Sequence, residues 1–305
     1  MNKVIVVVGP TATGKTNHCI ELSRQLNTEV VNADSRQIYT GMDIGTAKPT
    51  PDQLKILPHH LVSIRAPNSA FNVNDYKELC KKSMQQIMAK NKTPIICGGS
   101  GQYIYSVINN WGLGGVPPDH NFRKEMYKIA EDNGPDYLHT KLKAIDSKKA
   151  STIDYRNIPR VVRALEIAKH PQEQQQKPDQ FFADLKFLII GLTCERSLLY
   201  DRIDTRVDQM IAAGLVPEVE NLLTSGLDPK LPAFNSPGYR QIISYLSGVT
   251  TIEEAISEIK TKTHTLARKQ YNWFKPQDPS INWFDSSKPD FHSTATRLAQ
   301  DFLTS

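Results

Sequence analysis

The segment 9–16 constrains the fold of this chain more than any other, because it joins an apolar run to a stretch that permits a helix. The run Val4–Val8 is typical of a buried β-strand, and the helix-compatible stretch covers residues 17–26. Between them the spacing is G-x4-G-K-T, made by Gly9, Pro10, Thr11, Ala12, Thr13, Gly14, Lys15 and Thr16. A plain strand-to-helix turn is the alternative, and the complete pattern in this context disfavours it. The segment predicts a phosphate-binding loop.

The residue types in this loop suit a di- or triphosphate. Small residues let backbone N–H groups wrap around the phosphate oxygens, and the following helix adds the positive end of its dipole. Lys15 supplies a point charge, and the hydroxyl of Thr16 can hold Mg²⁺. The loop alone does not define a reaction, and whether a nucleotide such as ATP occupies it stays open.

Short β-rich runs alternate with helical patterns along the chain. The predicted strands cover 4–8, 29–32, 61–64, 94–97 and 187–192. Buried strands separated by helices favour a parallel sheet with helices on both faces. We therefore expect an α/β fold of the P-loop NTPase type.

The gap between the fourth and fifth predicted strands is too long for one crossover helix. Pro117 and Pro118 open it, and a segment rich in Gln and Pro, 171–180, closes it. Three helices are expected inside, over 122–132, 135–145 and 157–169. We expect a core of residues 1–116 and 185–305 with an inserted helical domain of residues 117–184.

Three arginines gather within eight residues of this insert: Arg156, Arg160 and Arg163. Arg160 and Arg163 are spaced i, i+3 and share a helix face. A solvated helix surface and a contact with an anionic partner are both open interpretations.

Two further segments follow predicted strands at the edge where ligands bind in parallel sheets. Asp34 follows the second strand, and from its position a general base, a turn-capping residue and a ligand of Mg²⁺ through water are all possible roles. Gly98, Gly99 and Ser100 follow the fourth strand, where they form either a close-approach loop with a hydroxyl or a plain turn. Arg240 begins a helical segment and either faces a phosphate or lies on the surface.

Composition excludes several classes of protein. The formal net charge of +5 mildly favours anionic binding partners. Four scattered cysteines without a C-x-x-C pair argue against structural zinc, and no apolar stretch approaches the roughly 20 residues of a membrane helix. We expect a cytoplasmic, reduced protein without a membrane association and without an obligate protein partner.

Several blocks together resemble the bacterial tRNA dimethylallyltransferases of the IPP transferase family. Besides the loop 9–16, the resemblance covers nearly the whole chain in order. Its blocks are 34–39, 41–49, 58–61, 98–100, 202–207 with 214–215, and 238–241. The block 41–49, GMDIGTAKP, is the most specific.

This resemblance implies transfer of a dimethylallyl group from dimethylallyl diphosphate to N6 of the adenosine next to the anticodon, position 37 of tRNA. It implies that the loop 9–16, with Lys15 and Thr16, holds the diphosphate and Mg²⁺. Asp34 would be the base near N6, Ser100 would hydrogen-bond in the reaction channel, and Arg240 would contact the diphosphate. The partner would be the anticodon stem-loop, contacted by Asp34, Ser35, Arg36, Gln37, Arg160, Arg163, Gly238, Tyr239 and Arg240.

The chain departs from the usual family pattern at three places. Ser100 stands where the family usually has Thr, which keeps the hydroxyl. Pro159 precedes Arg160 where a polar or basic residue is usual, and Arg268–Lys269 before Gln270 inverts a common order.

Three other functions use parts of the same pattern. An isopentenyltransferase acting on free adenine nucleotides would not need the insert. A small-molecule kinase would need an acceptor for the γ-phosphate and gives the block 41–49 no special role. A non-enzymatic RNA-binding module would not require Asp34.

Overall fold

The computed structural model describes residues 2–112, 116–170 and 179–305. The chain divides into two compact units, Met1–Asn110 with Gln180–Ser305, and Trp111–Asp179. The second unit starts and ends a few residues earlier than the insert 117–184 that we expected. Most of the Gln- and Pro-rich segment 171–180 lies outside the described residues.

The first unit contains a parallel sheet, as predicted. Its strand order is β3-β2-β4-β1-β5-β6, and every neighbouring pair is parallel. The strands are β1 (Asn2–Val8), β2 (Thr28–Asn32), β3 (His59–His60), β4 (Thr93–Cys97), β5 (Leu185–Thr193) and β6 (Ile281–Asp285). The carboxyl ends of β1, β2 and β4 therefore meet at one edge of the sheet, where the loop 9–16, Asp34 and Gly98–Ser100 follow them.

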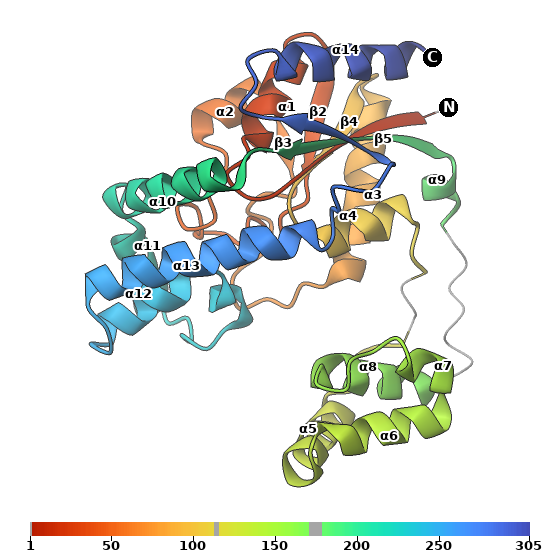
Figure 1. The fold of residues 1–305 in the computed structure, drawn as a ribbon, viewed down its shortest axis with the longest axis vertical. Helices are drawn as coiled ribbons and strands as arrows, with labels where there is room; N and C mark the ends of the chain where they lie inside the picture. Colours follow the sequence, from red (N-terminus) through yellow and green to blue (C-terminus); the bar gives the residue numbers. More distant parts are fainter. Residues whose placement is uncertain (1, 113–115, 171–178) are drawn as a thin grey trace. The chain divides into compact units, whose positions relative to one another are not determined.

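Helices cover both faces of the sheet, which confirms the predicted fold class (Figure 1). On one face α1 (Lys15–Ser23) packs beside α14 (Phe291–Thr304), and on the other α3 (Val73–Ala89) packs beside α4 (Gly101–Ile108). The side chains of β1 alternate between the two faces. Val4, Val6 and Val8 join the cluster under α3 and α4, while Ile5 and Val7 join the cluster under α1.

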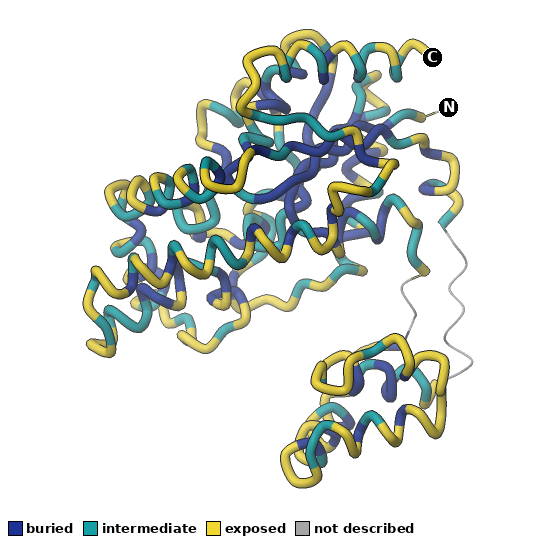
Figure 2. Tube along the Cα trace, viewed as in Figure 1, coloured by how far each residue is buried: buried dark blue, intermediate teal, exposed yellow. Residues whose placement is uncertain are grey.

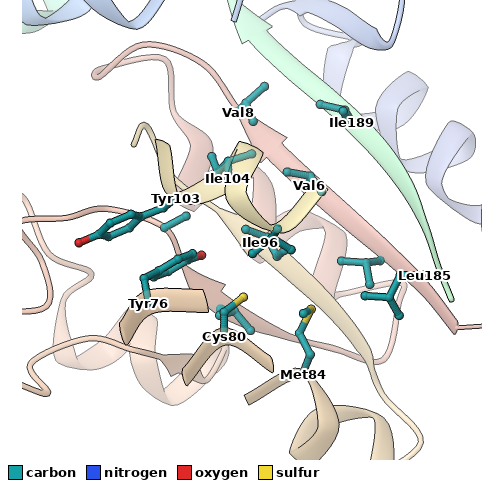
Figure 3. Close-up of a cluster of buried hydrophobic side chains, with 14 of the residues drawn as sticks. Val6, Val8, Tyr76, Cys80, Met84, Ile96, Tyr103, Ile104, Leu185 and Ile189 are labelled. Atoms are coloured by element: carbon teal, nitrogen blue, oxygen red, sulfur yellow. The ribbon is translucent and has the colours of Figure 1, made fainter. Parts of the chain in front are cut away.

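Figure 3 shows the first of these clusters, in which Met84 and Cys80 of α3 lie near Ile96 of β4. The rings of Tyr76 and Tyr103 stack above them with centroids 4.2 Å apart. Complete burial of one aliphatic side chain of this cluster stabilises the folded state by about 1.5 to 3 kcal/mol. This core fixes α4 and with it the turn Gly98–Ser100 that precedes the helix.

A group of helices follows β5 and packs around its own apolar cluster. It consists of α10 (Arg196–Ala212), α11 (Leu215–Thr224), the 3-10 helix η2 (Pro232–Asn235), α12 (Tyr239–Leu246) and α13 (Ile252–Tyr271). Two short helices, α2 (Pro51–Ile56) and α9 (Gln180–Ala183), complete this unit.

The structure corrects two details of the predicted sheet. The third strand covers His59–His60 and not 61–64, because Leu61 and Ser63 have φ of 62° and 52°, which an extended strand does not allow. The strand β6 was not predicted, because the short sequence INWFD has only one buried residue and lacks an apolar alternation.

The second unit is a small helical domain. It contains α5 (His120–Asn133), α6 (Pro135–Ile145), α7 (Ser147–Ala150) and α8 (Ile158–Ala168). Asn157 caps α8 by accepting from the N–H of Arg160, and Pro159 stands in the first turn, where its missing N–H costs nothing. Apolar side chains of α5, α6 and α8 form its core, and Figure 2 shows the buried positions facing one another inside the domain.

In the described part of the chain, no helix combines the length and the apolar character needed to cross a membrane.

Candidate active site

The loop Gly9–Thr16 joins β1 to α1, as predicted. Gly9 has φ of 140°, and a Cβ there would stand 2.3 Å from the carbonyl oxygen of Leu192 in β5. Gly14 has φ of 84° and precedes α1 without a side-chain cap. Glycine has no side chain to cap α1, so the first N–H groups of the helix are available to an anion.

Two cations lie at this edge of the sheet. The Nζ of Lys15 donates to the carbonyl oxygens of Gly9 at 3.0 Å and Pro10 at 2.7 Å. Arg206 of α10 is half-buried, and its guanidinium makes no ion pair or hydrogen bond to any residue that the structure describes. Burial lowers the pKa of both groups; at Lys15 the nearby Cys97 and Asp34 oppose this shift, and the charge of Arg206 adds to it. Half-buried cations without an acidic hydrogen-bond partner favour an anionic ligand.

Both cations line one cavity of about 760 Å³, a volume suited to a small-molecule ligand. The phosphate loop, the turn after β2, the segment 43–51 and α10 all contribute to its wall. The lining includes Lys15, Thr16, Asp34, Gln37, Asp43, Lys48, Gly98, Arg206 and Gln270.

Asp34 lines the cavity and Ser100 lies outside its lining, and a short set of hydrogen bonds links the loops that carry them. One carboxylate oxygen of Asp34, Oδ1, accepts from the N–H of Arg36 at 2.8 Å, so this oxygen does cap the turn. The other oxygen, Oδ2, has no hydrogen-bond partner among the described residues and can accept a proton. Ser100 Oγ accepts from the N–H of Ser35 at 2.9 Å, and the N–H of Ser100 donates to Ala33 at 3.1 Å. The two loops are therefore joined directly.

The segment 41–49 forms another wall of the cavity, and one carboxylate holds it from outside. Glu218 of α11 accepts from the N–H groups of Asp43 at 3.0 Å, Ile44 at 2.7 Å and Gly45 at 3.2 Å. The hydroxyl of Tyr239 donates to the same carboxylate at 2.6 Å. A Cβ at Gly45 would stand 2.5 Å from the Tyr239 ring, which explains a glycine there. Gln37 supports the segment by donating to the carbonyl oxygens of residues 46 and 47, each at 3.1 Å.

Some predicted site residues lie outside this cavity lining. Arg240 is exposed, and its Nη1 donates to Asn235 Oδ1 at 3.0 Å, so its contact with a diphosphate stays a prediction. Tyr239 is fully buried, and Gly238 has φ of 102° at the start of α12. Arg36 is bound to the carbonyl oxygen of Pro232 at 2.8 Å.

The two predicted arginines of the insert differ in their surroundings. Arg160 is exposed and uses only its backbone N–H, in the α8 cap. Arg163 donates to the buried Glu166 and, at 2.9 Å, to the carbonyl oxygen of Val116. Arg123 donates to the same carboxylate at 2.7 Å. Arg163 therefore serves the core of the insert.

Sequence reasoning missed Arg206 and Glu218 as site residues. Leu199, Ile203 and Val207 are the buried positions of α10, and Arg206 stands three residues after Ile203. An arginine on the buried side of an amphipathic helix was the available signal. Glu218 had no local signal, because its partners lie more than 170 residues earlier in the chain.

The donor set suits Mg²⁺ only when a ligand supplies further oxygens. Across the described ranges there is no group of three or more His, Cys, Asp or Glu side chains that could hold a metal ion. Thr16 is half-buried in the cavity wall. A hydroxyl together with phosphate oxygens and water is a usual Mg²⁺ environment in phosphate sites.

Comparisons with known proteins agree with this architecture. The sequence profile described as IPP transferase matches residues 37–277. A tRNA dimethylallyltransferase of Acetivibrio thermocellus is 39% identical over 298 residues, covering 95% of this chain and 94% of that protein. The crystal structure of the full-length tRNA isopentenylpyrophosphate transferase of Bacillus halodurans has a TM-score of 0.73 and 36% identity, covering 100% of this chain and 96% of that one.

A crystal structure of a eukaryotic dimethylallyltransferase acting on tRNA has a TM-score of 0.80 at 23% identity, over 100% of this chain and 80% of that one, and agrees in fold. The long sequence matches and the shared architecture together assign the chain to the IPP transferase family.

Proposed function

We propose that this chain, a tRNA dimethylallyltransferase by its family, transfers the dimethylallyl group of dimethylallyl diphosphate to N6 of the adenosine next to the anticodon, position 37. The observation that carries the proposal is the cavity in which the cations Lys15 and Arg206 share a wall with Asp34. Dimethylallyl diphosphate combines an anionic diphosphate with an electrophilic carbon. The cavity offers two cations to bind the diphosphate and a base to take the proton of the amine that attacks the carbon.

Lys15, Arg206 and the N–H groups of the loop 9–16 bind the diphosphate. As the C1–O bond of the donor breaks, its electron pair moves to the diphosphate oxygen, and negative charge grows there. The cations stabilise this leaving group more strongly than they stabilise the bound donor, which lowers the barrier.

Asp34 acts on the acceptor side. The N6 lone pair forms the new bond to C1, and the N6 proton passes to the open oxygen of the Asp34 carboxylate. Adenine N6 is a poor nucleophile because its lone pair is delocalised into the ring. A positioned base contributes about 10² to 10⁴ in rate to such a step. Ser100 accepts from the N–H of Ser35 and so holds the turn beside Asp34.

Thr16 would hold Mg²⁺ through its hydroxyl, together with diphosphate oxygens and water. When bound, the ion would add positive charge next to the leaving diphosphate. Lys15 and Arg206 hold the remaining diphosphate oxygens.

The anticodon stem-loop is the tRNA element proposed to bind. The exposed Arg160 is suited to a phosphate, and Asp34–Gln37 and Gly238–Arg240 are the core segments proposed to contact the stem-loop. The target base must leave its stack to reach Asp34. We place the activity in the cytoplasm.

Parallel incubations test this function. Purified protein with Mg²⁺ and labelled dimethylallyl diphosphate receives an unmodified anticodon stem-loop, the same stem-loop with guanosine at position 37, or free AMP. Label in the first RNA only, as N6-(dimethylallyl)adenosine, is expected. Label in AMP would indicate the free-nucleotide enzyme instead.

A further incubation replaces the prenyl donor with γ-labelled ATP. Transfer of label from ATP to a small acceptor would identify a kinase. Binding of the stem-loop without any transfer would identify an RNA-binding module and would refute the proposed reaction.

A further inference from the structure

Gln270 connects two loops of the active site through a single amide. It stands in the last turn of α13 and is buried. Its Oε1 accepts from the N–H of Thr11 at 2.8 Å, and its Nε2 donates to the carbonyl oxygen of Gly99 at 3.2 Å. A Cβ at Gly99 would stand 2.1 Å from Nε2, so the glycine makes room for this amide.

The two connected loops have opposite roles in the proposed reaction. Thr11 belongs to the loop that holds the diphosphate. Gly99 precedes Ser100, which holds Ser35 and therefore the turn that carries Asp34. The amide of Gln270 thus joins the leaving-group side of the cavity to the acceptor side, and it lines the same cavity.

The geometry points to Gln270 as a positioning residue that fixes the separation between the diphosphate loop and the Asp34–Ser100 side of the cavity. This inference rests on the proposed function. The reacting atoms must be held close to a productive distance, and a misplacement of about 1 Å can cost about 10²-fold in rate. Gln270 touches neither reacting atom, so its effect passes through the two loops.

Contacts other than this amide also hold α13 in place. α13 is also held by the buried Ala267 and Ile259. His264 binds Asp204 at 2.7 Å, and Lys260 binds Asp208 at 2.9 Å, both in α10. Replacing the amide therefore leaves the docking of α13 largely intact.

Two substitutions separate positioning from packing. Gln270→Met keeps a long side chain and removes both hydrogen bonds. Gln270→Glu keeps the shape and the acceptor for Thr11, but its carboxylate places an oxygen without a proton against Gly99. Gln277→Glu is the matched control, because Gln277 is exposed. For each protein, the melting temperature, the affinity for inorganic diphosphate, kcat and both KM values are measured.

For Gln270→Met we expect kcat to fall by about 10- to 100-fold. The melting temperature and diphosphate affinity should stay near wild type, and both KM values should stay within about threefold, since the binding groups remain. Wild-type kcat, or a loss confined to KM or to the melting temperature, would overturn the inference.

Gln270→Glu adds a pH-dependent readout. The buried carboxyl should have a raised pKa, and once protonated it donates to Gly99 as the amide does. Its kcat relative to wild type should therefore rise as the pH falls from about 8 to about 6, while the Gln277→Glu ratio stays flat. The other charged groups of the cavity, Lys15, Asp34, Asp43, Lys48 and Arg206, are present in every protein compared. A flat ratio for Gln270→Glu would also overturn the inference. Wild-type protein inactive on the stem-loop would instead refute the proposed function.

Discussion

Two cations of the core cavity and two cations of the insert have different surroundings. In the core, Lys15 binds only backbone carbonyl oxygens, and Arg206 has no acidic partner in the described sequence. In the insert, Arg163 and Arg123 both bind the carboxylate of Glu166, whose side chain is 1% exposed.

The difference separates cations that serve a ligand from cations that serve the fold. A buried charge without a partner is costly in the free protein, and an anion that enters the cavity removes that cost. A charge already paired inside a domain gains little from a phosphate, because the existing pair must first be broken. The following predictions test this contrast.

The largest effect is expected at Asp34, the acidic group that lines the same cavity as the two cations. Asp34→Asn should slow the chemical step by about 10² to 10⁴, since the amide keeps the shape and cannot take the N6 proton. Stem-loop affinity should change by no more than a few-fold. Single-turnover rates and binding titrations measure the two quantities, with the exposed Asp52→Asn as control. A loss confined to binding would rule out the base.

Lys15→Ala should lower kcat/KM for dimethylallyl diphosphate by about 10²-fold or more, because the lost charge acts on the departing diphosphate. Lys55→Ala is the control, since Lys55 is exposed and paired with Asp52. Unchanged kcat/KM in folded Lys15→Ala protein would eliminate the diphosphate role of this lysine.

Arg206→Met should lower kcat/KM for the donor by about 10- to 100-fold, the usual worth of a charged hydrogen-bonding group. The ligand-free protein should melt at the same or a higher temperature, because a half-buried charge without an acidic partner has been removed. The two readouts come from steady-state kinetics and calorimetry. A lower melting temperature with normal kinetics would place Arg206 with the structural cations of the insert.

The insert should lose stability in acid through Glu166. Burial alone would raise the pKa of this carboxyl, but hydrogen bonds from Arg123, Arg163 and the Asp119 N–H lower it to about 2 from an ordinary 4.5. The folded pKa lies below the unfolded one, so the stabilisation is present above about 4.5 and is lost as the pH falls towards 2.

Glu166→Gln should therefore destabilise the insert by about 2 to 3 kcal/mol at neutral pH and weaken this pH dependence. Urea unfolding followed by limited proteolysis within the insert measures both. The exposed pair of Asp154 and Arg156 is the control, and Asp154→Asn should have little effect. Equal stability of Glu166→Gln and wild type across this pH range would contradict the structural role.

The smallest effect is expected for Arg160→Ala. Stem-loop binding should weaken a few-fold, and the slope of log affinity against log salt should decrease by about 0.7 to 0.9, the contribution of one phosphate contact. Arg163→Ala should destabilise the insert and leave the salt slope of its folded form close to wild type. Wild-type affinity and slope for Arg160→Ala would make this residue part of a solvated surface.

The sequence predicted those parts of the site that follow from strand order. The loop 9–16, Asp34 and Ser100 each follow a strand closely. A parallel sheet therefore brings them to one edge, independently of how the helices pack. Local pattern therefore located three segments of one cavity. The IPP transferase resemblance was confirmed by the family comparison.

Residues from the helices could not be located in the same way. Glu218, Arg206 and Gln270 are polar residues on helices, and such residues usually face water. Their roles depend on how α10, α11 and α13 pack, which sequence periodicity does not specify. For Arg163 the sequence pattern misled in the other direction. Its spacing from Arg160 predicted one shared helix face and a similar role, but the guanidinium of Arg163 is paired with the buried carboxylate of Glu166.

The place of β5 in the sheet has a consequence for synthesis of the chain. β1 pairs along its whole length with β5, which the ribosome produces only after the insert has been made. The helices of the insert contact one another over short sequence separations, so this domain can fold as it emerges, whereas β1 must wait for β5, one of its two neighbours in the sheet. Until then the apolar β1 can pair with β4 and is an unprotected edge on its other side, a state that exposes the nascent core to aggregation.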